Sequence, residues 1–535
     1  MDNRESFLKW ALVASAAILF FTLGHRALWD PDEGRYAEMA REILALHDWV
    51  TPHLNYIPYL EKPMLFMWLN AVSFAVFGAT EWAARLVPFL CALAGAAVTG
   101  LMAYRLWGRR AGLLSALILM TSLEYFVLSS VVDINMTLTL FITAAMVFFW
   151  LGHAEKKPRY LFLAWASLAL ACLTKGPVGV VLPVGVVGLY ILLTRQFGLI
   201  GESKPIRGTG LFLALVLPWF VLAGMRNPEF FSYFFMDQNI ARYSVSSEHN
   251  KPFYYFILVI LGGVLPWTFM LPGAVRKLAG QPVPREVLYI LLWFFVILLF
   301  FMPSQSKLAT YVLPCFPPLA LLLGHGCKDG PERGGIALSS ACAVWLCLGV
   351  GLAFFPTLAS HGIIASSPRT IPLLDIARAA GAILILGTLA AVWVGRRYDR
   401  AAGYALLGIS LMVLFTVFSP GWDDQRSTRS LVQDLPAEAN LCAYKRYYQS
   451  SGFYAKRQVL LVDAAGELKF GLLHHPDKAR VLTLDDLSRL MSSDPGSYCL
   501  TSSRNLAPLR EKIPGIAVAR QAGGISLLHV PGRKP

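Results

Sequence analysis

Residues 64–79 read MLFMWLNAVSFAVFGA, and the topology of the chain depends on whether this apolar run crosses a membrane. Its hydropathy alone favours a crossing. Thirteen other apolar stretches have spanning length. They lie at about 8–24, 83–104, 110–130, 135–152, 160–174, 177–194, 209–225, 253–272, 286–302, 310–326, 335–355, 378–395 and 402–418.

The Lys and Arg residues that flank these stretches decide between the two topologies. Loops on the cytoplasmic side of a membrane carry an excess of positive charge. If 64–79 lies at the membrane surface, nineteen flanking basic residues fall on one side and seven on the other. We therefore predict thirteen transmembrane helices, a juxtamembrane helix at 64–79 and an uncleaved first span with a cytoplasmic N-terminus.

The composition excludes several classes of protein. Of the 535 residues, 56% are hydrophobic and 15% are charged, whereas soluble domains carry about 25% charged residues. Disordered chains are excluded because the apolar content is too high. Eight cysteines in a chain of this length also do not make a disulfide scaffold.

The net charge of +14 is explained mostly by topology. The positive excess of the membrane part follows the loop pattern described above. The polar tail after residue 420 holds 16 basic and 11 acidic residues, and this smaller excess would favour anionic lipid headgroups. Nucleic acid is therefore not an expected partner.

The tail, residues 421–535, is predicted to be a small α/β domain on the outer side. Short β-like runs such as QVLLVDA and ISLLHV alternate with helix-compatible stretches such as LDDLSRLMSS. Cys442 and Cys499 fall in two of these strands, and the sequence favours two buried thiols over a disulfide. The remainder, residues 1–420, forms the predicted transmembrane domain, whose long first outer loop covers 25–82.

That first outer loop is crowded with polar and aromatic residues, beginning WDPDEGRYAEMAREIL (29–44). Pro31 stops the first span, and Asp32 is placed to cap a following helix that carries Tyr36 on one face and Glu38 with Arg41 on the other. One interpretation is a cap and solvated charges. The other is a carboxylate in a cleft between membrane and water, where partial desolvation suits it to general-base chemistry.

Other ionisable residues on the outer side interrupt apolar sequence. Lys62 would either reach the headgroups or hold a lipid phosphate. Asp133 lies between two spans, where an acid is a functional candidate unless it only caps a helix. Glu61 and His249 would share a divalent ion only if their two loops meet. The sequence contains no zinc spacing, phosphate loop or dinucleotide-binding glycine pattern.

The chain resembles the bacterial aminoarabinose transferases that modify lipid A, and more broadly the polyprenyl-phosphate mannosyltransferase-like glycosyltransferases of the C-type (GT-C) membrane fold. The resemblance rests on a series of motifs in this order. They are PDEGRYAE (31–38), DWVTPHL (48–54), YLEKP (59–63), VVDIN (131–135), TKG (174–176), LPW (217–219), PEFFSYFF (228–235), EHNKPFYY (248–255), GGVLPW (262–267) and KLATYVLPCF (307–316).

The resemblance implies roles for particular residues. Asp32 matches the catalytic aspartate, with Glu33 and Arg35 beside it, and Asp133 matches a second acid of the cavity. The remaining matches are cavity tyrosines at Tyr36 and Tyr59, donor lipid-phosphate contacts at Lys62, Arg35, Arg242 and Lys307, and a structural zinc pair at Glu61 and His249. The sequence departs from the family pattern at Gly34, where a threonine is usual.

The implied activity is inverting transfer of a sugar from a polyprenyl (undecaprenyl) phosphate donor to lipid A or another envelope glycolipid. The implied location is the bacterial inner membrane, with the active site and the C-terminal domain facing the periplasm. A structural divalent metal such as zinc is implied and a nucleotide cofactor is not. We expect membrane lipids as partners and a monomer.

Two alternatives remain open at this stage. A protein O-glycosyltransferase would use the same donor, and sequence does not separate the acceptors. A transporter or lipid flippase would use Asp133 and the outer carboxylates as ion sites. Transporters usually show paired halves with corresponding broken helices, and the sequence shows no such internal symmetry.

Overall fold

The structure is a computed structural model that describes residues 3–241, 250–279, 282–327, 336–360, 373–478, 481–494 and 496–530. The described chain divides into two compact units. The first, here called the membrane unit, comprises Met1–Thr22, Pro88–Pro218 and Asn239–Phe418. The second, called the outer unit, comprises Leu23–Val87, Trp219–Gln238 and Ser419–Pro535.

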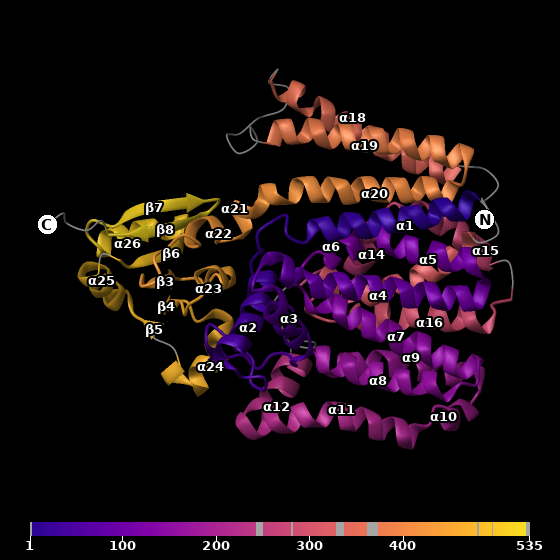
Figure 1. Ribbon diagram of the computed structural model, residues 1–535, viewed down its shortest axis with the longest axis horizontal. Coiled ribbons are helices and arrows are strands. Elements are labelled where there is room, and N and C mark those ends of the chain that lie inside the picture. The colour runs from indigo at the N-terminus through magenta and orange to yellow at the C-terminus, as the bar shows by residue number, and fades with distance from the viewer. Residues whose placement is uncertain are drawn as a thin grey trace. The chain divides into compact units, whose positions relative to one another are not determined.

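The membrane unit is built from helices (Figure 1). They are α1 (Asn3–Thr22), most of α4 (Glu81–Trp107), α5 (Arg109–Thr121), α6 (Leu123–Ser129), α7 (Ile134–Ala154), α8 (Pro158–Lys175), α9 (Val178–Thr194), α10 (Gly198–Glu202), most of α11 (Pro205–Arg226), α14 (Tyr255–Gly263), η2 (Trp267–Met270), α15 (Leu271–Ala279), α16 (Arg285–Phe301), η3 (Ala309–Cys315), α17 (Phe316–Cys327), α18 (Ile336–Ser360), α19 (Leu373–Arg397) and α20 (Arg400–Phe418).

Each of the thirteen predicted spans coincides with helix in the structure. Among the described residues, eight helices are long and apolar enough to cross a membrane, or up to ten if each of two bent pairs is one span. The helices α8, α9 and α16 occupy the three remaining predicted positions. The chain is therefore a multi-pass membrane protein, and thirteen crossings stay a prediction.

Two of the predicted spans are bent rather than straight. The helices α5 and α6 meet at 68°, and Tyr255–Gly263 meets Trp267–Lys277 at 101°. The first bend lies at Ser122, whose backbone is extended. The second contains Pro266, which has no N–H to continue a helical ladder. The two bends contact each other, because the Leu123 N–H donates to the Leu265 carbonyl at 3.2 Å.

The apolar run at 64–79 forms α3, Leu65–Phe77, within the outer unit. Thirteen residues make a helix of about 20 Å, shorter than the roughly 30 Å hydrocarbon core of a bilayer. The helix ends at Gly78, whose φ of 79° is costly for residues with a Cβ. Its length agrees with the prediction that this run does not span.

The outer unit holds the first outer loop and the C-terminal α/β fold. Its remaining elements are α2 (Asp32–Leu46), β1 (His53–Leu54), β2 (Ile57–Pro58), α12 (Phe230–Ser232), part of the π-helical η1 (Tyr233–Ala241), η4 (Ser419–Trp422), α21 (Asp423–Arg426), α22 (Arg429–Val432), β3 (Leu441–Tyr444), α23 (Gln449–Ala455), β4 (Leu460–Val462), η5 (Gly466–Leu468), α24 (Lys469–His474), η6 (Pro476–Lys478), β5 (Val481–Leu482), α25 (Leu484–Ser493), β6 (Tyr498–Ser502), η7 (Ser503–Asn505), α26 (Leu506–Lys512), β7 (Ala517–Ala522) and β8 (Ile525–His529).

The C-terminal sheet has the strand order β5-β4-β3-β6-β8-β7. The first four strands are parallel, and β8 and β7 are antiparallel additions. One face of the sheet packs against α25 and α26 through Leu487, Met491 and Leu509. The connection from β3 to the parallel strand β4 contains α23, which packs against α2 (Figure 1).

The predicted α/β tail is confirmed, with one strand missed. Cys442 and Cys499 lie side by side in register on β3 and β6. Both are buried free thiols, as the sequence favours. The missed strand, β7, is largely exposed and includes Arg520 and Gln521, so it lacks the apolar alternation that marks the others.

The first outer loop, Leu23–Val87, groups with Ser419–Pro535 in the outer unit. The Asn55 side chain, for example, donates to the Val459 carbonyl at 2.9 Å and accepts from the Val459 N–H at 2.7 Å. A buried asparagine paired in this way fixes the loop to the start of β4. The domain limits 1–420 and 421–535 stay a prediction.

We predict that Leu487→Ala destabilises the C-terminal fold, because this fully buried α25 side chain fills the sheet core. The expected cost is about 2–5 kcal/mol. Hydrogen exchange of the C-terminal strands in the full-length protein measures this local stability. Leu473→Ala, at a side chain that is 68% exposed, is the control and should change exchange little. Equal exchange in the two variants would contradict the assigned core.

Candidate active site

The helix α2 begins at Asp32 and brings the predicted catalytic carboxylate to its first turn. The expected capping role is wrong, because Pro31 occupies the N-cap position and no side chain caps the helix. The Asp32 carboxylate lies instead 3.0 Å from Arg35, one turn along, and its side chain is 50% exposed. A guanidinium one turn along thus holds an accessible carboxylate at the N-terminus of α2.

Arg35 links this carboxylate to the C-terminal fold. Its second guanidinium nitrogen lies 2.7 Å from Glu467 of η5, and both side chains are 18% exposed. Burial opposes the charge on Arg35, but the pKa of Arg35 is nevertheless raised by Tyr59, Glu467 and Asp32. Because both guanidinium ends contact carboxylates, the geometry favours positioning of Asp32 over the predicted contact with a donor phosphate.

Glu467 is in turn held by two neutral side chains. Gln449 donates to one carboxylate oxygen at 2.6 Å, and the Tyr59 hydroxyl donates to the other at 3.4 Å. Burial and the nearby Glu61 raise the pKa of Tyr59 well above its usual value, so this phenol stays protonated and able to donate. The predicted cavity residue Tyr59 therefore belongs to the network around Asp32.

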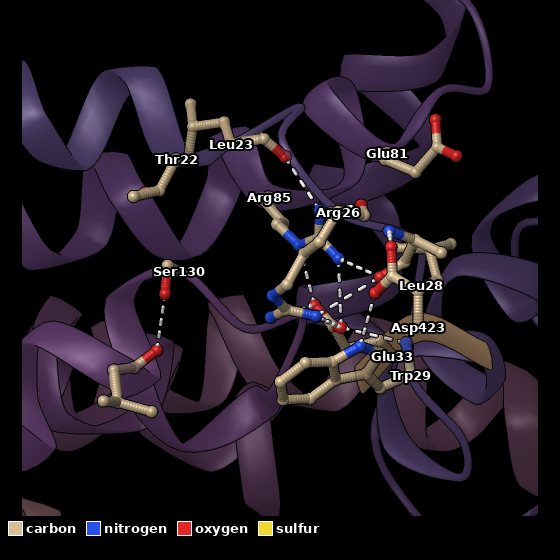
Figure 2. Close-up of polar contacts among 12 residues, drawn as sticks. Thr22, Leu23, Arg26, Leu28, Trp29, Glu33, Glu81, Arg85, Ser130 and Asp423 are labelled. Atoms are coloured by element: carbon tan, nitrogen blue, oxygen red, sulfur yellow. Dashed lines mark hydrogen bonds and ion pairs between the residues drawn. The ribbon is translucent and has the colours of Figure 1, made fainter. Parts of the chain in front are cut away.

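Glu33, next to Asp32, is enclosed by two arginines (Figure 2). Its carboxylate bonds Arg26 and lies 2.8 Å from the Arg85 Nε. All three side chains are at most 2% exposed. Burial by itself would raise the pKa of Glu33. The two guanidinium groups outweigh this effect and lower the pKa to about 2. Burial and Arg85 lower the pKa of Arg26 to about 10, so the three groups are charged at neutral pH.

Arg85 also orders the chain that leads to α2. It donates to the carbonyls of Leu23, Arg26 and Ala27 at 2.7–2.9 Å (Figure 2). These carbonyls lie just beyond α1, where helical hydrogen bonds have ended. Arg85 therefore satisfies backbone carbonyls that precede α2, and the Glu33 carboxylate lies beside its charge.

Asp423 attaches the same turn to the start of the C-terminal fold. Its carboxylate accepts the Ala27 N–H at 2.8 Å and the Trp29 indole N–H at 2.9 Å. The Arg26 guanidinium stacks over the Trp29 ring at 4.0 Å (Figure 2). Trp29 is thus fixed on both its edge and its face.

Asp30 makes a second attachment, to α23. Its carboxylate accepts the Ser450 N–H at 2.6 Å and the Ser450 hydroxyl at 2.8 Å. Burial raises the pKa of Asp30 to about 7, although the Ser450 hydrogen bonds lower it. At Gly34, a Cβ would lie 2.4 Å from the Ser450 nitrogen. This close approach explains why the position holds glycine instead of the threonine usual in the family pattern.

The polar face predicted for α2 is wrong, because Glu38 is fully buried and not solvated. Arg41 contacts both of its carboxylate oxygens at 2.7 Å. Glu42, one turn on, is also buried and accepts the Tyr56 N–H at 2.9 Å. Burial and the neighbouring Glu38 raise the pKa of Glu42 well above its usual value. The face is covered by α23, where Gly452 would bring a Cβ to 2.7 Å from Glu38.

Three more predicted residues lie in the outer unit. Tyr36 is 5% exposed and packs edge-on against Phe66 at 5.3 Å. Lys62 is half-buried, and its ammonium donates to the Glu61 carbonyl at 3.0 Å. The outer unit thus carries Asp32, Arg35, Tyr36, Tyr59, Glu61 and Lys62.

The other described candidates lie in the membrane unit. Asp133 is buried and caps α7, accepting the Asn135 N–H at 2.6 Å, so the structure shows the capping role that the sequence left open. The Asn135 side chain accepts from Lys175 at 2.5 Å, and Lys175 lies over the Tyr311 ring at 4.5 Å. Lys307 is 6% exposed and donates to the Ser304 carbonyl.

Arg242 and His249 lie outside the described residues, so the structure does not test them. Within the part of the chain that is described, no group of three or more His, Cys, Asp or Glu side chains is arranged to hold a metal ion. Of the expected zinc pair, only Glu61 is described. The pair stays a prediction, and no chemical step is assigned to a metal.

Family models match both ends of the chain. Residues 8–234 match "Dolichyl-phosphate-mannose-protein mannosyltransferase", and residues 428–525 match "Aminoarabinose transferase C-terminal domain". The undecaprenyl phosphate-alpha-4-amino-4-deoxy-L-arabinose arabinosyl transferase of Erwinia tasmaniensis is 31% identical over 517 residues, covering 91% of each chain. The Aeromonas salmonicida transferase of the same description is 32% identical over 515 residues, covering 89% of this chain and 90% of its own.

The chain belongs to the aminoarabinose transferase family. It is therefore a glycosyltransferase of the GT-C fold, and the transporter alternative loses its support. The crystal structure of ArnT from Cupriavidus metallidurans bound to undecaprenyl phosphate matches with a TM-score of 0.86 and 27% identity, covering 99% of both chains. The apo structure of the same protein matches with a TM-score of 0.85 and 26% identity, with the same coverage.

Three residues that hold the proposed active site were not predicted from the sequence. Arg85 had a usable signal, since a charged residue near the start of an apolar helix requires a partner. Glu467 and Asp423 had none, because each is one of many acids in a polar domain. Only the packing of the first outer loop on the C-terminal fold gives them a role.

We predict that Glu33→Gln destabilises the transferase strongly, because it leaves Arg26 and Arg85 buried against each other. Removing one partner of a buried ion pair costs about 3–5 kcal/mol. The thermal unfolding midpoint of the purified protein should fall by several degrees. Glu438→Gln removes an exposed acid of the same unit and serves as the matched control. Equal unfolding midpoints for the two variants would contradict the stabilising role of the ion pairs between Glu33 and the two arginines.

We predict that titration of Asp30 makes the folding stability of the protein depend on pH. The pKa of Asp30 rises from 3.8 in the unfolded chain to about 7 in the folded one, so the folded state binds more protons between these values. The contribution of Asp30 to stability is therefore highest below about pH 4 and declines as pH rises through about 7. Across this window, wild type should lose stability relative to Asp30→Asn, by an amount on the order of a few kcal/mol.

The measurement is thermal unfolding of both proteins at several pH values between 5 and 8. Taking the difference between wild type and variant cancels the titration of all other groups. A difference that does not change with pH would show that Asp30 does not titrate in this window.

Proposed function

We propose that this enzyme transfers 4-amino-4-deoxy-L-arabinose from undecaprenyl phosphate to lipid A at the periplasmic face of the bacterial inner membrane. Relatives described as undecaprenyl phosphate-dependent arabinosyl transferases align over about nine-tenths of the chain. The observation that carries the proposed chemistry is the half-exposed Asp32 carboxylate, held by Arg35 in an otherwise buried ionic network. The distribution of basic residues supports the orientation.

In the proposed reaction, an acceptor oxygen attacks the anomeric carbon from the face opposite the phosphate. The bond from that carbon to the phosphate oxygen breaks, and its electron pair leaves with undecaprenyl phosphate. A cation near the leaving oxygen stabilises the charge that develops there. Lys62 is proposed for this role, and the sequence adds Lys307 and Arg242 as further phosphate contacts.

The role of Asp32 depends on the acceptor. A sugar hydroxyl must lose a proton, and Asp32 would accept it as general base. A lipid A phosphate is already an anion, so no proton need be removed before it attacks. With that acceptor, Asp32 would stabilise the positive charge that develops on the sugar ring as the donor bond breaks.

The surrounding network suits Asp32 to either role. Arg35 fixes the Asp32 carboxylate in place, and Glu467 holds the other end of the same guanidinium. The remaining exposed face of Asp32 is open to a substrate. Its neighbour Glu33, in contrast, is enclosed by Arg26 and Arg85, so the geometry favours a structural role over the catalytic one suggested by the motif.

We predict that Asp32→Asn lowers turnover by at least about 100-fold, because the amide neither accepts a proton nor carries the stabilising charge. Purified enzyme is incubated with undecaprenyl-phosphate aminoarabinose and lipid A, and mass spectrometry follows modified lipid A and released undecaprenyl phosphate. Asp477→Asn, at an exposed acid of η6, is the matched control.

Each outcome of this assay is informative. Full turnover by Asp32→Asn would remove the catalytic assignment. Donor consumption only when a Ser- or Thr-containing peptide replaces lipid A would replace the proposed acceptor with a protein. No turnover with any polyprenyl-phosphate sugar would overturn the proposed donor.

A further inference from the structure

An apolar groove lies in the membrane unit, among α7, α8, α9 and the turn that joins α10 to α11. Its volume is about 260 Å³, whereas one water molecule occupies roughly 30 Å³ in the liquid. One face of α8, from Leu161 to Leu168, forms one wall, and one face of α9, from Val184 to Ile191, forms another. None of the residues that line the groove takes part in the proposed sugar transfer.

The lining favours hydrocarbon over water. Of the described residues that line the groove, only Trp165 and Ser203 carry a side-chain N–H or hydroxyl. The Trp165 indole N–H already donates to the Ser203 carbonyl at 2.9 Å, and the Ser203 hydroxyl donates to the Ile200 carbonyl at 2.7 Å. An ordered water needs two to four polar partners, which this lining does not offer. The molecule that fills the groove is therefore expected to be apolar.

The groove opens to the surface of the membrane unit. Val184 and Gly188 on the α9 wall are both exposed, and a Cβ at Gly188 would meet no atom within 4 Å. At the α10–α11 turn, in contrast, the Trp165 indole lies directly against Gly208, where a Cβ would overlap the ring. A hydrocarbon chain can thus enter sideways between α8 and α9, while the end of the groove is held by packing.

The end of the groove at the α10–α11 turn is basic. Lys204 lies between two lining residues of this turn, and Arg207 follows in the first turn of α11. Both side chains are exposed, and the described structure contains no ion pair for either of them. Glu202, the nearest acid in sequence, is held by Lys156 at 2.8 Å and by His153 at 2.9 Å. Two positive charges therefore remain available at this end of the groove.

Exposed apolar side chains indicate that the same turn lies at a membrane surface. Phe197 and Ile200 are exposed, and Ile206, next to Arg207, is 89% exposed. Large apolar side chains beside basic ones are typical of segments in the membrane interface. Figure 1 shows α10 and the start of α1 at the same end of the membrane unit. The flanking basic residues predict the cytoplasmic side of the membrane for this end.

We propose that this groove binds one acyl chain of an anionic phospholipid, whose phosphate lies at Lys204 and Arg207. Basic side chains at a membrane surface attract anionic headgroups. Leu161 and Leu168 are two helical turns apart, so the walls enclose about 10 Å of the chain. The groove shares no residue with the network around Asp32, and the proposal therefore does not depend on the proposed transferase reaction.

The acyl chain is tested with the full-length protein in phosphatidylcholine liposomes that contain a phosphatidylglycerol probe with a photoactivatable diazirine near the end of one chain. Peptide mass spectrometry should find labels around Leu168 and Val184, away from the α10–α11 turn. Gly188→Leu fills the groove and should lower this labelling about tenfold, the loss equivalent to about two buried methylene groups. Gly351→Leu, at an exposed glycine of α18 whose Cβ would also meet no atom within 4 Å, is the matched control.

The headgroup is tested with a phosphatidylcholine probe that carries the same chain. Wild type should be labelled in the groove about tenfold more by the phosphatidylglycerol probe, because two basic residues attract its headgroup. Lys204→Gln/Arg207→Gln should remove this preference. Lys9→Gln/Arg276→Gln, which removes two basic residues of α1 and α15 at the same end of the unit, is the matched control and should keep it.

Three results would overturn the proposal. They are labelling of the groove that Gly188→Leu leaves unchanged, equal labelling by the two probes in wild type, and displacement of the probe by undecaprenyl phosphate together with a higher KM for the sugar donor in Gly188→Leu. The last result would assign the groove to the tail of the donor. If Gly188→Leu does not fold, Val184→Trp narrows the groove from the same exposed wall and should cause the same loss of labelling.

Discussion

The organisation of the outer unit depends on one buried ionic cluster, the Glu33 carboxylate between Arg26 and Arg85. Burying one carboxylate and two guanidinium groups is expensive unless their charges and hydrogen bonds are matched. Here Glu33 bonds both arginines, and Arg85 also satisfies three backbone carbonyls beyond α1. This joins the end of the first span, the start of α4 and the first turn of α2, so the cluster sets the position of Asp32.

The C-terminal fold holds the turn that carries Asp32, although this fold begins almost four hundred residues later. Asp423 holds Ala27 and Trp29, Ser450 holds Asp30, and Glu467 holds Arg35. Each of these contacts joins a residue of the C-terminal fold to the stretch of chain on either side of Asp32. The α/β domain is thus a structural part of the proposed active site, and changes in its core should reach Asp32 through these contacts.

The sequence was sufficient for much of the fold, because helix and strand periodicity are local properties. The helices at the predicted spans, the short α3 and five of the six C-terminal strands follow from it. The sequence did not predict features that depend on long-range packing. Glu38 has the spacing of a solvated charge but is buried under α23, and the exposed β7 lacks apolar alternation. Glu467 became a site residue only through contacts that no local pattern contains.

Asp30, Asp32 and Glu33 lie within four residues, and their different surroundings suit them to different roles. Glu33 is paired with two arginines and has a pKa of about 2, so it remains charged. Asp30 is buried against neutral donors, and its pKa of about 7 lets it exchange a proton near neutrality. Asp32 alone is half-exposed, with one cation holding it and one face open. An acid that must meet a substrate needs both features, since an enclosed carboxylate is inaccessible and an unheld one is poorly oriented. The buried neighbours therefore serve the exposed one: they fix the backbone on both sides of Asp32 and leave only its carboxylate available for chemistry.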